Sequence, residues 1–265
     1  FMSQNGSYNI ALGQKAMQQA SSVAFNVAIG WEALKEIGNG SFAISNIGIG
    51  TKAFGKAKGG TKNIGIGGLA LNENGNGNSN IAIGEYVMSK IKSGNDNIAI
   101  GINSMLSDSS SWGQIAIGNN TLYKNQEGEN NMAIGDSVLF SNIEGNRNIG
   151  IGEGVLEKNL GSNNRALGVD AMTNNVNGFS NIAIGNNTIL EDNNAVNQLA
   201  IGHDALKKAS TGDNNLAIGS GSQINNNAGN LNTSVGHGSL GGLFGAPSYT
   251  GSQNTAIGYN SLSIN

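Results

Sequence analysis

Fifteen copies of one short phrase divide the chain: an amide residue, an aliphatic residue, a small residue, a second aliphatic residue and a glycine. Residues 80–84 read Asn-Ile-Ala-Ile-Gly, and so do residues 97–101. Eleven of the fourteen intervals between closing glycines are seventeen residues long; the exceptions run from Gly30 to Gly50, from Gly152 to Gly168 and from Gly236 to Gly258. A fixed period of this length makes each repeat one layer stacked on similar layers, so the sequence predicts a solenoid of about fifteen coils. The closing glycines are Gly13, Gly30, Gly50, Gly67, Gly84, Gly101, Gly118, Gly135, Gly152, Gly168, Gly185, Gly202, Gly219, Gly236 and Gly258.

Large and small residues alternate within each phrase, as at Ile98, Ala99 and Ile100. A β-strand places alternate residues on opposite faces, so each phrase is predicted to be a short strand and the fold to be all-β. A second apolar pair follows three and four residues after the closing glycine, and we expect it to fold back onto the strand's aliphatic face. The isoleucine before the closing glycine is then the expected repeat core. These core residues include Ile29, Ile83, Ile100, Ile117, Ile134, Ile184, Ile201 and Ile218.

The small residue and the amide of the phrase have their own expected roles. The small residue is expected to lie where another backbone approaches closely, and the closing glycine to allow positive φ or tight passage at a corner. The amide is Asn in thirteen repeats and Gln at Gln114 and Gln198. Stacking would bring these amides into register at about 4.8 Å, where they can form a side-chain ladder. The alternative is that each amide only makes a tight turn.

Composition excludes several functions. A formal net charge of −3 leaves no basic stripe, so no nucleic-acid partner is expected. The chain has no cysteine for a disulfide or a thiolate metal site, and no apolar run approaches the roughly 18 residues that span a bilayer. The glycines of residues 65–68 and 150–154 are ordinary repeat glycines, and no Ser/His/Asp or paired-carboxylate arrangement recurs. We therefore predict that the protein is not an enzyme and has no catalytic residue, cofactor, metal or membrane-inserted segment.

Two long intervals interrupt what we expect to be a single repeat domain over residues 1–265, itself a fragment of a longer fibrous protein. The corresponding loop insertions lie near residues 37–45 and 241–250. The second insertion contains the only proline and presents Phe244 and Tyr249 as candidate receptor contacts; the alternative is that it caps the roll. Trp31 and Trp112 are further candidates, because an exposed indole can stack on a sugar, although packing is the commoner role of tryptophan.

Each layer offers about three large aliphatic side chains, which is little to offset the ordering of so many glycines and asparagines. A core shared among several chains would remedy this shortage, and we infer a homotrimer. In a trimer His203 and His237, which both follow closing glycines, would form rings of three imidazoles that can bind a metal. The alternative is two surface histidines without a role.

The phrases at residues 80–84, 97–101 and 181–185, together with Asn26-Val27-Ala28-Ile29-Gly30, resemble the head repeat of YadA-like trimeric autotransporter adhesins. Similar repeats occur in trimeric phage tail fibres, and the longer Asn-x-Ala-Ile-Gly-x-x-x-Leu phrase at 254–262 looks closer to those. The resemblance covers essentially the whole chain. It implies a left-handed parallel β-roll, three chains intertwined or side by side about one axis, and a role in surface attachment.

The function expected from this resemblance is a structural and adhesive segment of a trimeric fibre that attaches to a host cell surface. A phage tail fibre in the virion is the first hypothesis, and the head of a bacterial trimeric autotransporter adhesin at the cell surface is the alternative. The partners are then other copies of the chain and an extracellular host receptor, either a glycan or an outer-membrane protein. A left-handed β-helix acyltransferase would need a hexapeptide rhythm and a catalytic histidine. An ice-binding solenoid would need a threonine array, and a calcium-binding roll an aspartate in every repeat.

Overall fold

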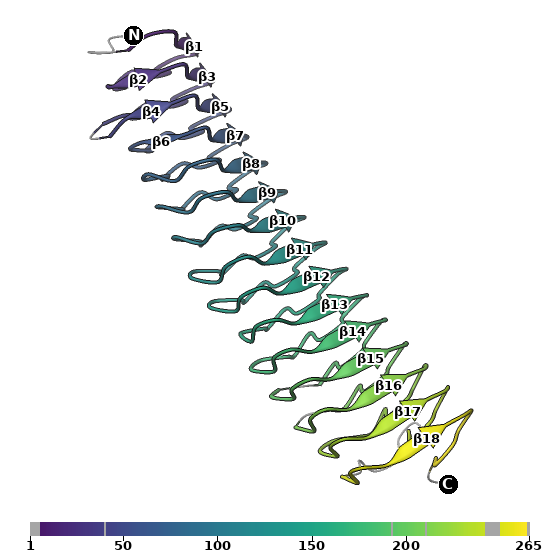
Figure 1. Cartoon of the computed structure of the whole chain (residues 1–265). Helices are drawn as coiled ribbons and strands as arrows, with labels where there is room; N and C mark the ends of the chain where they lie inside the picture. The colour runs from purple at the N-terminus through teal and green to yellow at the C-terminus, as the bar shows by residue number, and fades with distance from the viewer. Residues whose placement is uncertain (1–5, 40, 192, 210, 242–249, 264–265) are drawn as a thin grey trace. The chain divides into compact units, whose positions relative to one another are not determined.

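The computed structural model describes residues 6–39, 41–191, 193–209, 211–241 and 250–263. Within these ranges every regular element is a β-strand and no helix occurs. The chain divides into two compact units, residues 1–131 and 132–265. Each unit is a parallel β-solenoid in which every layer contributes one short strand to the main sheet (Figure 1). The structure therefore confirms the all-β solenoid predicted from the repeat.

The described part of the first unit stacks its three-residue strands in parallel and in chain order. Register brings equivalent positions together, so that Ala99 lies beside Ala116. A smaller parallel sheet of β2 (Val23–Ala24), β4 (Ala43–Ile44) and β6 (Gly60–Thr61) lies in the same unit, and β4 falls inside the insertion near residues 37–45. The main strands are β1 (Ile10–Leu12), β3 (Val27–Ile29), β5 (Ile47–Ile49), β7 (Ile64–Ile66), β8 (Ile81–Ile83), β9 (Ile98–Ile100) and β10 (Ile115–Ile117).

The second unit repeats this arrangement. Its strands pair in parallel with the same register, as where Ala183 of one layer lies beside Ala200 of the next. The shorter interval before Gly168 is absorbed without loss of pairing, because Arg165 still pairs with Ile149 on one side and Ile182 on the other. The strands are β11 (Met132–Ile134), β12 (Ile149–Ile151), β13 (Arg165–Leu167), β14 (Ile182–Ile184), β15 (Leu199–Ile201), β16 (Leu216–Ile218), β17 (Thr233–Val235) and β18 (Thr255–Ile257).

The interior of each layer lies between the small residue of the strand and the segment that follows the closing glycine. Ala99 and Ala116 are fully buried, and so are Met105 and Leu122, each four residues after a closing glycine. The space is narrow: a Cβ added to Gly65 would come within 2.7 Å of the Phe54 ring. The small residue thus makes room for the large side chains of the returning segment of the same chain, rather than for another backbone.

The prediction that the repeat isoleucines form the core of each layer is wrong for the single chain. The returning segment folds against the small-residue face of the strand, so the isoleucines of the opposite face point outward. Ile83, Ile117 and Ile184 are 36%, 37% and 40% exposed. The remaining residues of this predicted core are partly exposed: Ile29, Ile100, Ile134, Ile201 and Ile218. The physical reason is size, because the interior is already filled by large side chains of the returning segment, such as Val138 and Leu139.

The amides that precede the strands form the predicted side-chain ladder. The Nδ2 of Asn63 donates to the Oδ1 of Asn46 across 3.0 Å, and the backbone N of Asn63 donates to the same oxygen. The same Nδ2 also donates to the carbonyl of Gly77 across 2.7 Å, at the return turn. In the second unit the backbone N of Asn232 donates to the Oδ1 of Asn215 across 2.9 Å. One buried amide therefore both links two layers and closes a turn.

The closing glycines have the predicted positive φ. Gly67 has φ +129°, and a Cβ placed on it would lie 2.1 Å from the carbonyl oxygen of Gly84 in the next layer. Any side chain here would have to displace backbone rather than a movable group. The column of closing glycines is thus required by the spacing between layers as well as by backbone conformation.

Candidate functional site

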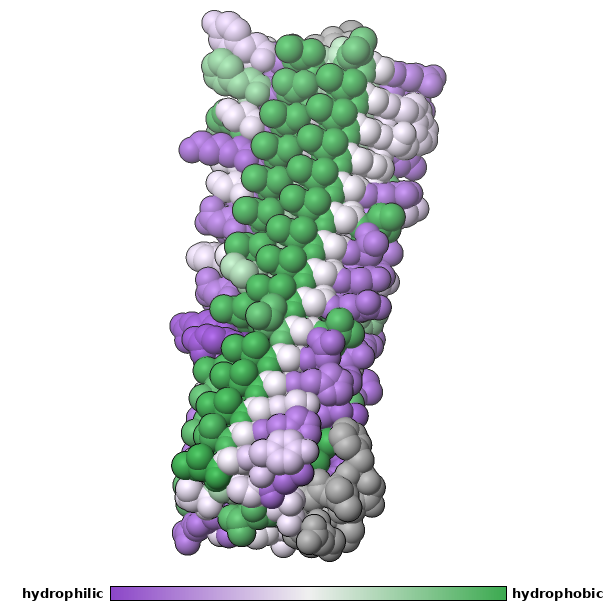
Figure 2. Space-filling model, turned by 90° about the vertical axis from the view of Figure 1, so that its right-hand side faces the viewer, coloured by the Kyte–Doolittle hydropathy of each residue, from purple (hydrophilic) through white to green (hydrophobic). Residues whose placement is uncertain are grey.

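The first and third residues of the main strands form an exposed surface in each unit, here called the apolar band. Figure 2 shows their side chains gathered in adjoining apolar columns, with a column of paler residues along one edge. The band consists of Ile, Val, Leu and Met side chains, with exceptions at Arg165, Thr233 and Thr255. Parallel in-register pairing is what produces it, because each strand places its outward aliphatic residues beside those of the next layer.

The apolar band is contiguous within each unit, which is unusual for the surface of a soluble monomer. Single exposed aliphatic residues are normal, but soluble monomers rarely expose contiguous apolar patches above a few hundred Å². Within each unit the band continues from strand to strand; Ile66 and Ile83 are each 36% exposed, and other band residues such as Ile100 are partly exposed. Stiff β-branched side chains on a sheet lose little further entropy on contact, so this face is suited to packing against another apolar face.

The sequence-predicted tryptophans lie on the surface but far apart. Trp31 is 40% exposed and follows closing glycine Gly30, with the Lys52 ammonium 4.9 Å from the ring centre. Trp112 is 55% exposed and lies before β10, five strand steps from β3 and hence roughly 24 Å along the stack. The two indoles therefore do not form one site. The other predicted receptor contacts, Phe244 and Tyr249, lie outside the described residues.

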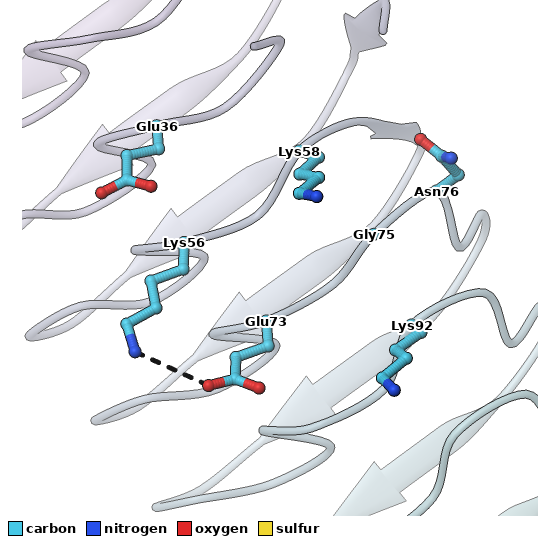
Figure 3. A pocket seen from close by; sticks show the side chains of 7 residues that line it. All are labelled: Glu36, Lys56, Lys58, Glu73, Gly75, Asn76 and Lys92. Carbon is cyan, nitrogen blue, oxygen red and sulfur yellow. Dashed lines mark ion pairs between the residues drawn. The ribbon is translucent and has the colours of Figure 1, made fainter. Parts of the chain in front are cut away.

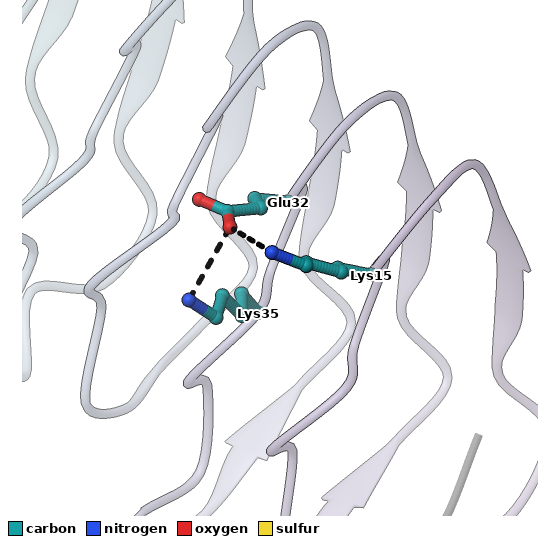
Figure 4. A network of polar contacts seen from close by, with 3 residues as sticks. All are labelled: Lys15, Glu32 and Lys35. Carbon is teal, nitrogen blue, oxygen red and sulfur yellow. Dashed lines mark hydrogen bonds and ion pairs between the residues drawn. The ribbon is translucent and has the colours of Figure 1, made fainter.

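An ion-pair network links the first two layers of the first unit (Figure 4). The Glu32 Oε1 lies 3.4 Å from the Nζ of Lys15 and 3.4 Å from the Nζ of Lys35. Desolvation raises the pKa of the Glu32 carboxyl, but hydrogen bonds and charge from Lys35 and then Lys15 outweigh it, so the pKa lies below its ordinary value. The network joins neighbouring layers and leaves its charges satisfied, which indicates a structural role.

A second charged cluster in the first unit surrounds an open pocket of about 560 Å³ (Figure 3). Lys56 and Glu73 pair across 3.6 Å within it. Lys58 and Lys92 lie on two layers, with Gly75 on the layer between them, and neither forms an ion pair with any described residue. Sequence reasoning missed this cluster, although the lysines and the glycine share one repeat position, eight residues after a closing glycine. The lining residues are Glu36, Lys56, Lys58, Glu73, Gly75, Asn76 and Lys92.

The two histidines have separate neighbours. The Nδ1 of His203 lies 3.3 Å from the Oδ2 of Asp204, and the His237 ring stacks on Tyr259 with 5.4 Å between ring centres. In the described ranges no group of three or more His, Cys, Asp or Glu side chains is placed to hold a metal ion. A search of the same residues found no helix of the length and hydropathy that crossing a membrane requires.

Comparison with known proteins adds no assignment: no family model matches the chain, and neither curated proteins nor solved structures include a significant match.

Proposed function

We propose that the chain is a structural and adhesive segment of a trimeric fibre, in which three copies pack through their apolar bands and attach the fibre to a host cell surface. The observation that supports this proposal is the exposure of the repeat isoleucines. In the proposed fibre these residues form the core that the single chain does not enclose, and the coils are left-handed layers of mostly seventeen residues.

The apolar band suits an assembly in which three copies are related by rotation about a common axis parallel to the stack. Closed rotational symmetry keeps all chains in the same register, so each layer meets the equivalent layers of its neighbours. The outward isoleucines would then meet isoleucines, as at Ile98 and Ile100 of β9. The partial exposure of these side chains in one chain leaves apolar area to be removed from water on association, at about 25 cal/mol per Å².

The resemblance of the repeats to trimeric phage tail fibres supports a location in the virion, and the resemblance to YadA-like heads supports the bacterial surface as the alternative. Either setting is extracellular and needs a receptor on the opposing cell, a glycan or an outer-membrane protein. In the proposal the long regular stack spaces the attachment site away from its anchor, and the irregular layers supply specificity.

Sedimentation of the full chain tests the trimer. We expect a particle with three times the mass of one chain, which is 27.0 kDa. Ile100→Lys with Ile117→Lys places charges in the apolar band and should shift the chain to monomer. Ser93→Lys with Gln126→Lys adds the same charge at two exposed turn residues and should leave the trimer intact.

Circular dichroism shows whether the variants keep their strands. A wild-type chain that sediments with the mass of a single copy over the micromolar range would overturn the trimer. Binding of labelled wild-type protein and of the Ile100→Lys/Ile117→Lys variant to candidate host cells then tests attachment. A trimer that binds no host cell would support the structural role in the proposal and contradict the adhesive role.

A further inference from the structure

One column of the first unit has glycine at alternate layers. Eight residues after successive closing glycines the chain reads Ser21, Gly38, Lys58, Gly75 and Lys92. These residues are neighbours in space: the Oγ of Ser21 donates to the carbonyl of Gly38 across 2.9 Å, and the N of Gly38 donates to the carbonyl of Lys58 across 2.9 Å. A hollow lies beside each of the two glycines, Gly38 and Gly75.

The hollow at Gly75 has a net positive charge, because its three lysines outnumber Glu36 and Glu73. Lys58 and Lys92 flank it two strand steps apart, roughly 10 Å along the stack. Both are exposed and make no ion pair with a described residue, whereas Lys56 is paired with Glu73 across 3.6 Å. The Oδ1 of Asn76 accepts from the Oγ of Ser41 across 2.8 Å, which leaves its Nδ2 to donate to a ligand.

The hollow at Gly38 is a different kind of pocket, about 400 Å³ in volume. Ser21, Ser22 and Ser41 line it with hydroxyl groups, and Phe42 lines it with an aromatic ring that is 75% exposed. The two hollows adjoin, because Ser41 of this pocket is hydrogen-bonded to Asn76 of the cationic one. Together their lining residues make up one stretch of surface from Phe42 to Lys92, here called the lysine groove.

We infer that the lysine groove binds an acidic oligosaccharide, with a sugar ring against Phe42 and sulfate or carboxylate groups against Lys58 and Lys92. An aromatic face beside hydroxyl groups suits a sugar ring, which is apolar on its faces and polar at its edge. Ammonium groups with no ion-pair partner suit anions, which they meet as charge-assisted hydrogen bonds. The inference deepens the proposed function by naming the chemistry of a host receptor. It does not depend on the trimer, because no groove residue belongs to the apolar band.

Isothermal titration calorimetry of the full chain provides the test, with three probes of equal length: heparin hexasaccharide, hexagalacturonate and neutral maltohexaose. We expect at least one of the two acidic probes to bind and the neutral probe not to bind. Heparin carries both sulfates and carboxylates and hexagalacturonate only carboxylates, so binding of heparin alone indicates sulfate, and binding of hexagalacturonate shows that carboxylates suffice. Lys58→Gln with Lys92→Gln should weaken binding at least about tenfold. Phe42→Ala should weaken it about fivefold through loss of the ring.

Lys62→Gln with Lys208→Gln removes two charges outside the groove and is the matched control, expected to change affinity less than about twofold. Failure of both acidic probes to bind the wild-type chain would overturn the inference. So would equal weakening by the control pair, which would show general attraction of polyanions. Sedimentation of the same variants should be unchanged, so the outcome for the groove and that for the trimer are read separately.

Discussion

Asp108 occupies in its layer the buried position that Asn125 occupies in the next, and the Nδ2 of Asn125 donates to the Oδ2 of Asp108 across 3.5 Å. The position lies seven residues after a closing glycine, and in the second unit it forms a column of amides: Asn159 donates to Asn142 across 3.0 Å. Burial raises the pKa of Asp108 to about 6, although hydrogen bonds from the Ser111 hydroxyl and amide work in the opposite direction. A carboxyl group thus stands at the position where Asn125, Asn142, Asn159 and Asn175 place an amide in later layers.

The first prediction is a loss of stability between pH 4 and pH 6 caused by Asp108. Burial raises the pKa of Asp108 in the folded chain from 3.8 to about 6, so folding favours the protonated carboxyl. Its contribution to the free energy of unfolding is therefore complete below pH 4 and is lost as pH rises through 6. Asp108→Asn should remove this loss and stabilise the chain at pH 7 by roughly 3 kcal/mol. Urea unfolding at pH 4, 5, 6 and 7 measures it. Exposed Asp96→Asn is the control, and an equal gain from both variants would contradict the assignment.

Removal of a single amide from the ladder should destabilise the chain. Asn63→Ala removes the donor to Asn46 and Gly77 and leaves the buried backbone N of Asn80 without its acceptor. We expect a loss of about 2 kcal/mol or more in the free energy of unfolding, since each unsatisfied buried polar group costs about 1–3 kcal/mol. Exposed Asn193→Ala should change it by less than about 0.5 kcal/mol. Equal losses in the free energy of unfolding for Asn63→Ala and Asn193→Ala, measured by chemical denaturation, would contradict a stabilising role of the ladder.

Adjacent glycines should respond in opposite ways to the same substitution. Gly67→Ala puts a methyl group 2.1 Å from the Gly84 carbonyl at φ +129°, and we expect a cost of about 3 kcal/mol or more. Gly68→Ala meets nothing closer than 3.7 Å, so it should be neutral or stabilise by up to about 1 kcal/mol. Thermal unfolding of both variants checks the contrast. Tolerance of Gly67→Ala would mean that the layers can separate at this corner.

Because Ala116 points inward and Ile117 points outward, substitutions at these two residues should differ in their cost to stability. Ala116→Leu adds volume to a filled interior and should destabilise the chain by about 1–3 kcal/mol. Ile117→Leu changes the shape of an outward side chain that is 37% exposed, and its cost to the folding of one chain should be small. Urea unfolding should be run in an Ile100→Lys background that sedimentation shows to be monomeric. A larger loss in the free energy of unfolding for Ile117→Leu than for Ala116→Leu would show that the isoleucines face the interior.

Much of the fold could be predicted from positions within the repeat. The alternation at Ile98 to Ile100 predicts a strand, and the closing glycine predicts a corner with positive φ; the structure confirms both. The amides predicted either a ladder or a turn, and Asn63 makes both contacts at once. The lysine groove was missed, because Lys58 and Lys92 lie two repeats apart in the sequence and only the pairing of layers makes them neighbours across Gly75.

By itself the sequence determined that layers stack, where each strand lies and which residues repeat in columns, because all three follow from period and alternation. Which face of the strand is inside was decided only by tertiary structure. Alternation assigns residues to two faces of the strand but does not say which face is buried. Hydrophobicity alone predicted that the isoleucine face would be the buried one. The enclosed space is filled by large side chains of the returning segment, such as Leu122, so the strand has to present Ala116 inward and Ile117 outward.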